Sequence, residues 1–173
     1  MTTTNNRAVE VFRYHLTPGN LFSSNDQAMV SAVLGTCVAV CLHDRRLKIG
    51  GMNHFQYPKT GFFGVGSNDY GDVAIPALIQ KLRRLGSRVE DLEAQIFGGG
   101  DMPGQRDGNT GQKNVKIARK ILKKNGISVV SEDVGGFKGR RLIFHTGTNE
   151  ALVMKTHRIR RGDYYPYRQR IGN

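Results

Sequence analysis

Hydrophobic and polar residues follow one another in short runs along most of this chain, a pattern typical of β-strands. Residues 9–16, VEVFRYHL, alternate between apolar and polar with a period of two, as expected for a half-buried strand. Two further apolar runs, AMVSAVLG and CVAVCLHD, meet at a short turn that contains Gly35 and Thr36. The other expected strands are KIGGMNHF, EAQIFGG, ISVVSED, RRLIFHT and ALVMKT.

Two segments have the apolar spacing of helices instead. In DVAIPALIQKLRRLG, Asp72 is placed to cap the helix, and Pro76 falls in the first turn, where its missing N–H costs little. The residues expected to be buried are Leu78, Ile79, Leu82 and Leu85, with Gly86 at the end. The second helix, TGQKNVKIARKILKKNG, should bury Val115, Ala118, Ile121 and Leu122 and end at Gly126.

These elements predict an α/β fold with more strands than helices. Several strands are joined by short turns, so the sheets should be mixed rather than purely parallel. The length of 173 residues suits one domain with a sizeable core. We therefore expect a single domain of mixed β-sheets with flanking helices over residues 1–157, followed by a basic tail over residues 158–173.

The composition of the chain indicates the cellular compartment in which we expect the protein. The first residues, MTTTNNRAVEVF, lack the apolar core of a signal peptide. No stretch approaches the roughly 20 apolar residues of a membrane span. Two cysteines in a chain of this size favour free thiols in a reducing environment. We expect a cytoplasmic protein that is not inserted in a membrane.

The net charge of +12 favours anionic partners. Cations and tyrosines are concentrated near the C-terminal end, with Asp163 as the one acid among them: Lys155, Arg158, Arg160, Arg161, Tyr164, Tyr165, Tyr167, Arg168 and Arg170. Such a segment could bind nucleic acid, because aromatic rings stack on bases and cations contact phosphates. A solvated terminus is the alternative interpretation, and the charge pattern alone leaves both open.

Cofactor signals are weak. The run GGGDMPG at residues 98–104 follows an expected strand, but the dinucleotide-binding fingerprint would need glycine where Pro103 stands. The glycines more simply serve a loop that needs positive φ angles. The five histidines are scattered, without the spacing of a metal site. We expect no cofactor and no metal.

The two cysteines differ in setting. On one strand, Cys37 and Cys41 would lie about 13 Å apart, too far for a disulfide. Cys41 has apolar neighbours on both sides in the sequence and is most simply a core residue. Cys37 follows the turn, where backbone N–H groups could hold an oxyanion, and His54 is a candidate base for its thiol.

Five blocks in order give a more specific indication: LGTCVAVCLHD, IGGMNHFQYP, YGDVAIPALI, IFGGGDM with NTGQKN, and EDVGGFKGRRLIFHTGT. Together they resemble the chemoreceptor glutamine deamidase family, CheD, over roughly residues 30–150. The resemblance implies a fold similar to cysteine-dependent deamidating toxins. It also implies that Cys37 is the nucleophile, that His54 is its partner, and that Ser31, where the family has threonine, assists.

The implied activity is that of a protein-glutamine glutaminase. Cys37 and His54 would convert glutamine side chains of methyl-accepting chemotaxis receptors to glutamate through a thioester, which adjusts methylation sites and adaptation. We expect His54 to form an ion pair with the Cys37 thiolate. The implied partners are the receptors and a CheC-type phosphatase, whose contact would include Met102 and Pro103. This interpretation expects a monomer without nucleic acid; a basic nucleic-acid-binding module is the alternative.

Overall fold

The computed structural model describes residues 11–61, 65–101 and 108–165. The strands are β1 (Phe12–His15), β2 (Asn20–Ser24), β3 (Ala28–Leu34), β4 (Val38–Asp44), β5 (Ile49–His54), β6 (Leu92–Gly98), β7 (Ser128–Val134), β8 (Gly139–His145) and β9 (Ala151–Thr156). The helices are α1 (Gly71–Arg84) and α2 (Thr110–Lys124), and two short 3₁₀ helices are η1 (Val89–Asp91) and η2 (Arg161–Tyr164).

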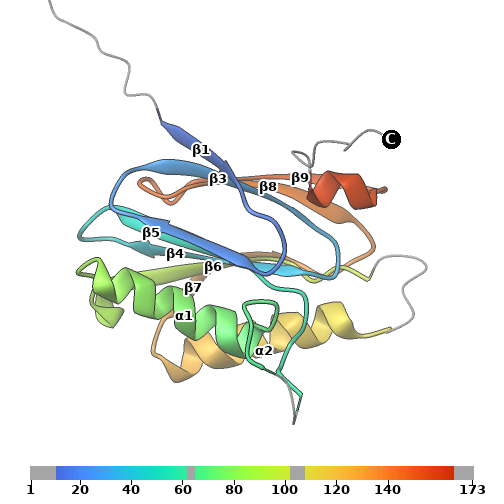
Figure 1. Cartoon of the computed structure of the whole chain (residues 1–173), viewed down its shortest axis with the longest axis horizontal. Coiled ribbons are helices and arrows are strands. Elements are labelled where there is room, and N and C mark those ends of the chain that lie inside the picture. The colour runs from blue at the N-terminus through green and yellow to red at the C-terminus, as the bar shows by residue number, and fades with distance from the viewer. Residues whose placement is uncertain (1–10, 62–64, 102–107, 166–173) are drawn as a thin grey trace, which may run out of the picture.

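The strands form two mixed sheets, as the sequence predicts. One sheet has four strands in the order β1-β3-β8-β9, and the other has five in the order β2-β5-β4-β6-β7. The pairs β1/β3 and β6/β7 are parallel, and the other pairs are antiparallel. Figure 1 shows the sheets stacked on one another, with α1 and α2 covering the outer face of the five-stranded sheet. The predicted α/β fold class is confirmed.

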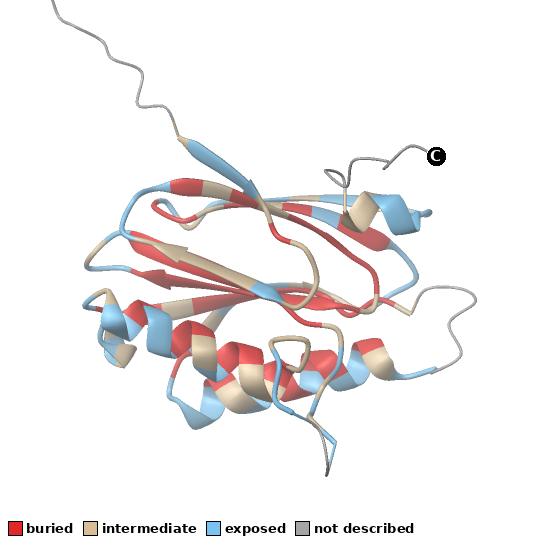
Figure 2. Ribbon diagram, in the orientation of Figure 1, coloured by how far each residue is buried: buried red, intermediate tan, exposed pale blue. Residues whose placement is uncertain are grey.

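Buried residues lie on both sheets and on both helices (Figure 2), and their side chains form two layers. The larger layer lies between the five-stranded sheet and the helices and includes Val38, Phe55 and Leu78. The second layer includes Leu34, Cys37 and Met52. It lies between the sheets, because side chains alternate along a strand and β4 contributes neighbouring residues to opposite layers. The central strands of the five-stranded sheet, β5, β4 and β6, are therefore buried on both faces.

Three local expectations need correction. The strand β2 was not expected, because NLFSS has no alternation of apolar and polar residues. These residues adopt a strand because they pair with β5. Helix α1 begins at Gly71, after Tyr70 as the N-cap residue. Asp72 is consequently inside the helix, where its carboxylate accepts hydrogen bonds from Thr60, and is not the cap. Pro76 falls in the second turn rather than the first.

The buried residues of the two helices agree with those that the sequence predicts. Leu78, Ile79 and Leu82 are buried on α1, and Leu85 just beyond its end is half-buried. On α2, Val115, Ala118 and Leu122 are buried and Ile121 is half-buried. Gly86 and Gly126 follow the two helices with φ angles of 100° and 70°. Neither helix, nor any other in the described residues, is long and apolar enough to cross a membrane.

Candidate active site

Cys37 lies where the chain passes from one sheet to the other. Strand β3 belongs to the four-stranded sheet and β4 to the five-stranded sheet, and only residues 35–37 connect them. The side chain of Cys37 enters the layer between the sheets and is only 7% exposed. The thiol therefore sits at one end of the sandwich, held by both sheets.

The glycine run at the end of β6 packs directly against this turn. Gly99 donates its backbone N–H to the Cys37 carbonyl at 2.8 Å, and Gly100 donates to the Gly35 carbonyl at 2.9 Å. Gly98 has a φ of 104°, and a Cβ atom there would lie 2.2 Å from the Cys37 oxygen. The glycines thus allow two backbone segments to approach closely. The expectation of a loop with positive φ angles is confirmed at Gly98 and Gly99.

His54 is on the strand beside the cysteine, on the same face. Val38 and Phe55 pair across β4 and β5 with reciprocal backbone hydrogen bonds of 3.0 Å and both face the helices. Cys37 precedes Val38 and His54 precedes Phe55, so both point to the opposite face, between the sheets. Diagonal neighbours in an antiparallel pair have Cα atoms about 7–8 Å apart. The structure therefore places these two predicted residues on one face as diagonal neighbours.

The imidazole of His54 is completely buried and has one nitrogen engaged. Its Nδ1 lies 3.1 Å from the carbonyl oxygen of Leu16 and must carry the proton in that hydrogen bond. Its Nε2 is buried and has no hydrogen-bond partner among the described residues. In the neutral ring, Nε2 then carries the lone pair. This tautomer can accept a proton from a group placed between the sheets.

Burial sets the protonation of both groups. It raises the pKa of the Cys37 thiol to about 12. A hydrogen bond from the backbone N–H of Cys37 itself lowers this pKa, and the negative charge of Asp69 raises it further. Burial lowers the pKa of His54 to about 4, with partial compensation by the Leu16 carbonyl. Burial therefore favours the neutral form of both groups in the free protein and opposes the expected thiolate–imidazolium ion pair.

Ser31 is connected to His54 through the main chain. The backbone N–H of Leu16 donates to the Ser31 carbonyl at 2.7 Å, and the carbonyl of Leu16 in turn accepts from His54. The hydroxyl of Ser31 lies elsewhere: its Oγ is 3.1 Å from Nδ1 of His15 and 3.4 Å from the carbonyl of Tyr14. Ser31 alternates with the inward-facing Val30 and Ala32, so its side chain is on the outer face of the four-stranded sheet.

Asn114 on α2 is a structural part of the site that the sequence analysis missed. Its Nδ2 donates to the carbonyl of Thr36 at 2.9 Å and to the carbonyl of Gln56 at 2.8 Å. Thr36 precedes Cys37, and Gln56 follows the His54 strand, so one buried amide joins the two segments. The available signal was a polar residue within the buried stripe of a helix, since Asn114 is 0% exposed.

Asp69 is a second missed contributor. Its carboxylate accepts from Gln56 Nε2 at 2.8 Å and from the Ser67 hydroxyl at 3.0 Å. The charge of Asp69 adds to the burial effect that raises the Cys37 pKa, and it raises the His54 pKa against the dominant lowering by burial. Asp69 therefore lies within electrostatic range of both groups. No local pattern in the sequence indicates this position.

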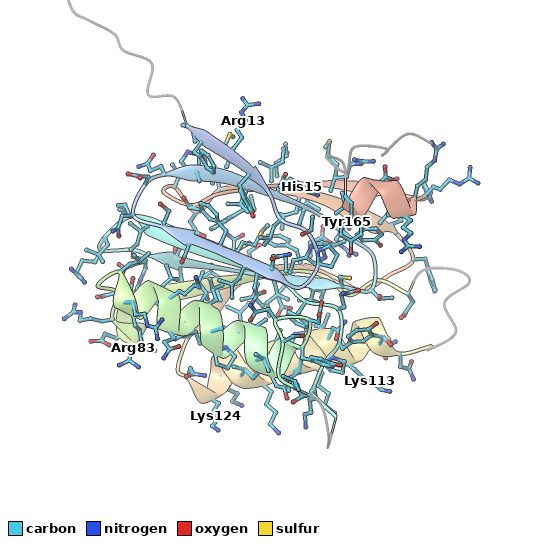
Figure 3. The ribbon with its side chains drawn as sticks, in the orientation of Figure 1. Arg13, His15, Arg83, Lys113, Lys124 and Tyr165 are labelled. Carbon is cyan, nitrogen blue, oxygen red and sulfur yellow. The ribbon has the colours of Figure 1, made fainter. Side chains whose placement is uncertain are left out.

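The C-terminal 3₁₀ helix also approaches the site. His15 Nε2 lies 3.3 Å from the Tyr164 carbonyl, and Figure 3 labels His15 and Tyr165 where β1 nears the end of η2. Burial raises the pKa of the Tyr164 hydroxyl to about 12, and the Cys37 thiol contributes to the increase. Part of the segment expected as a tail thus packs near the thiol. Residues 166–173 lie outside the described residues, as do Met102 and Pro103.

Cys41 contrasts with Cys37. It is completely buried in the layer between the sheets, and burial alone raises the pKa of its thiol. Both cysteines are free thiols. In the described part of the chain, no group of three or more His, Cys, Asp or Glu side chains is arranged to hold a metal ion. The Cys37–His54 pair is therefore the best-formed candidate for chemistry.

Comparison with known proteins identifies the relatives of this chain. The family described as "CheD chemotactic sensory transduction" matches residues 64–155. A protein of Rhodospirillum rubrum named "Probable chemoreceptor glutamine deamidase CheD" is 43% identical over 140 residues, covering 80% of this chain and 79% of its own. The "Chemoreceptor glutamine deamidase CheD" of Thermotoga maritima is 37% identical over 131 residues, covering 76% of this chain and 83% of its own.

Two stacked mixed sheets, with a buried cysteine and histidine on neighbouring strands at one end, define an α/β protein with a candidate Cys–His active site. The matched segment is more than half of the chain, and the two relatives align with most of it. The chain belongs to the CheD family.

Proposed function

We propose that this protein hydrolyses specific glutamine side chains of chemotaxis receptors to glutamate, with Cys37 as nucleophile and His54 as acid and base. Membership of a family whose members are named chemoreceptor glutamine deamidases supports the substrate. The observation that supports the chemistry most directly concerns Nε2 of His54. This nitrogen has no hydrogen-bond partner among the described residues and is buried on the face that His54 shares with Cys37. A general base needs such a lone pair within reach of the proton that it removes.

The first half of the reaction forms a thioester. The Cys37 sulfur attacks the side-chain amide carbon while its proton passes to His54 Nε2. Because the thiol pKa is about 12 and the imidazole pKa about 4, we place this transfer in the bond-forming step rather than before it. In this proposal, backbone N–H groups by the Gly35–Thr36 turn stabilise the oxyanion. His54 then returns the proton to the nitrogen, the C–N bond breaks, and ammonia leaves.

The second half restores the enzyme. A water molecule attacks the thioester carbon while His54 Nε2 takes its proton. The C–S bond breaks, the glutamate product leaves, and the sulfur recovers a proton from the imidazolium. Leu16 holds the ring in the required tautomer throughout, through the 3.1 Å contact with Nδ1. The cycle balances with one water consumed and one ammonia released, and it uses no metal or cofactor.

Ser31 assists in this proposal as a positioning residue. Its carbonyl fixes Leu16, and its hydroxyl bridges β3 to His15 on β1. We further propose that the protein acts in the cytoplasm as a monomer and that a CheC-type phosphatase binds it. The domain boundary at residue 157 also remains a prediction.

Ammonia release from a purified receptor cytoplasmic fragment tests the proposal. Cys37→Ala and His54→Ala should each abolish release, and the double variant should be no worse, because the two residues act as one unit. Cys41→Ala is the matched control and should retain activity. Mass spectrometry should find a gain of about one mass unit at the modified glutamines, since an NH₂ group is replaced by OH. An active Cys37→Ala variant would remove the basis for this mechanism.

A further inference from the structure

Helix α2 has an unusual charge pattern. Its fifteen residues include no Asp or Glu, but they include Lys113, Lys116, Arg119, Lys120, Lys123 and Lys124. Three of these, Lys113, Lys116 and Lys120, line a pocket of about 380 Å³ together with Lys59 from the segment after β5. The remaining lining residues are Pro58 and Ile117, which give the pocket an apolar floor. Figure 3 shows Lys113 and Lys124 at opposite ends of α2.

The four pocket lysines form no ion pair within the part of the chain that the structure describes. The ion pair on this helix is that of Arg119 with Glu132, and neither residue lines the pocket. Asp72 contacts Thr60, the residue after Lys59, and accepts hydrogen bonds from that threonine. The lysines therefore present their charges to whatever enters the pocket.

This arrangement weakens the helix rather than stabilising it. Lys113–Lys116 and Lys116–Lys120 are like-charge pairs at spacings of three and four residues, which are unfavourable on a helix surface. Lys113 is in the first turn, where the helix dipole disfavours a cation. Lys123 and Lys124 differ, because the dipole favours cations in the last turn. A stabilising effect on the helix explains why Lys123 and Lys124 are at its end, but it does not explain the three lysines of α2 that line the pocket.

Two elements of the pocket continue along the chain from residues that hold the candidate active site. Lys113 immediately precedes Asn114, whose amide holds the turn before Cys37 and the segment after His54. Pro58 and Lys59 continue the same segment from Gln56. A large substrate with one side chain at Cys37 would thus extend over the first half of α2.

We propose that this lysine pocket binds carboxylates of an acidic segment in the protein substrate, beside the glutamine that is modified. The inference rests on the proposed function for the identity of the substrate. The lysines at positions 113, 116 and 120 span about 10 Å along α2 at the rise of a helix, so they match carboxylates spaced over two turns of a partner helix. Nucleic acid is less suited, because the lining residues that the structure describes include no aromatic ring on which bases could stack.

The test compares two triple variants with the same net charge. The pocket variant is Lys113→Gln/Lys116→Gln/Lys120→Gln, and the control is Lys81→Gln/Lys123→Gln/Lys124→Gln, at exposed positions outside the pocket. Binding of a fluorescent oligoglutamate peptide should weaken about tenfold in the pocket variant at low salt and less than about twofold in the control. On the receptor fragment, KM should rise in the pocket variant while kcat is retained.

Two readouts separate this inference from the proposed function. If the wild type releases no ammonia from receptor, the proposed function fails, while the peptide comparison still decides whether the pocket binds acidic polypeptide. Equal weakening in both variants would overturn the inference, because net charge alone would explain it. A single-stranded RNA of equal charge that binds more tightly than the peptide, with the same loss in the pocket variant, would also overturn it in favour of nucleic acid.

Discussion

Nδ1 of His54 lies 3.1 Å from the main-chain carbonyl oxygen of Leu16. Leu16 is in turn fixed by the 2.7 Å hydrogen bond from its N–H to Ser31. A main-chain carbonyl cannot be titrated, so it orients the imidazole at any pH without adding a charge. The tautomer of this buried histidine is therefore set by the path of the backbone just after β1.

The first prediction concerns the pH dependence of receptor deamidation. The mechanism needs neutral His54 and protonated Cys37, and burial moves their pKa values to about 4 and about 12. As pH rises, kcat/KM should increase through the His54 pKa and then stay level until alkaline pH. Ammonia release measured from about pH 5.5 to 9 should vary less than about threefold. An acid limb near the ordinary histidine pKa of about 6.5 would contradict a buried neutral base.

The second prediction distinguishes the cysteines by alkylation. Cys37 is 7% exposed and Cys41 is 0% exposed, so iodoacetamide should label Cys37 first in the folded protein. The rate should increase about tenfold per pH unit below the raised thiol pKa, because the thiolate is the reacting species. His54→Ala should change the rate little, since burial favours the neutral form of both groups. A large drop in that variant would indicate an ion pair instead, and preferential labelling of Cys41 would contradict the assignment of Cys37.

The third prediction concerns Ser31. Ser31→Ala removes the hydroxyl that contacts His15 at 3.1 Å but keeps the carbonyl that holds Leu16. Turnover should fall only a few-fold, by about the factor that one hydrogen bond represents, and the fold should be retained. Ser31→Thr restores the hydroxyl and should keep most activity. His15→Ala is the informative partner: if the hydroxyl acts through His15, the double variant should lose no more than either single variant.

The parts of this site that could be predicted are those that depend on residues close together in the sequence. Cys37 and His54 follow from sequence blocks, and the strands that carry them follow from local alternation. Asn114 and Asp69 could not be placed in the same way, because their roles come from contacts with segments far along the chain. The strand β2 was missed for the same reason, since only its pairing with β5 makes it a strand.

The fourth prediction concerns the segment that includes η2. Asp163 pairs with Arg141 at 3.3 Å, and the Tyr164 carbonyl contacts His15. Deleting residues 162–173 should leave the strands folded by circular dichroism but increase Cys37 alkylation several-fold, because Tyr164 no longer packs near the thiol. Deleting only residues 166–173 is the control and should leave the rate unchanged. Equal rates in the two deletions would show that η2 does not shield the site.

The last prediction concerns the amide of Asn114, which holds the carbonyls of Thr36 and Gln56 at 2.9 and 2.8 Å. Asn114→Asp keeps the shape but removes both donors and places a carboxylate against two carbonyl oxygens. Each buried carbonyl left without a partner costs about 1–3 kcal/mol, so the free energy of unfolding should fall. The turn before Cys37 would also shift relative to His54, and a displacement of about 1 Å can reduce turnover about a hundredfold.

A pH readout separates positioning from general loss of stability in this variant. Lowering the pH protonates the introduced carboxyl group, which then regains one donor, so kcat should partly recover toward about pH 5 while the wild-type rate stays level. Asn125→Asp, at the C-cap of the same helix, is the matched control, because the side-chain amide of Asn125 donates to the carbonyl of Ile121 at an exposed position. It should retain wild-type turnover. A variant at position 114 with normal kcat and only a lower melting temperature would mean that the amide stabilises the fold without aligning the two catalytic segments.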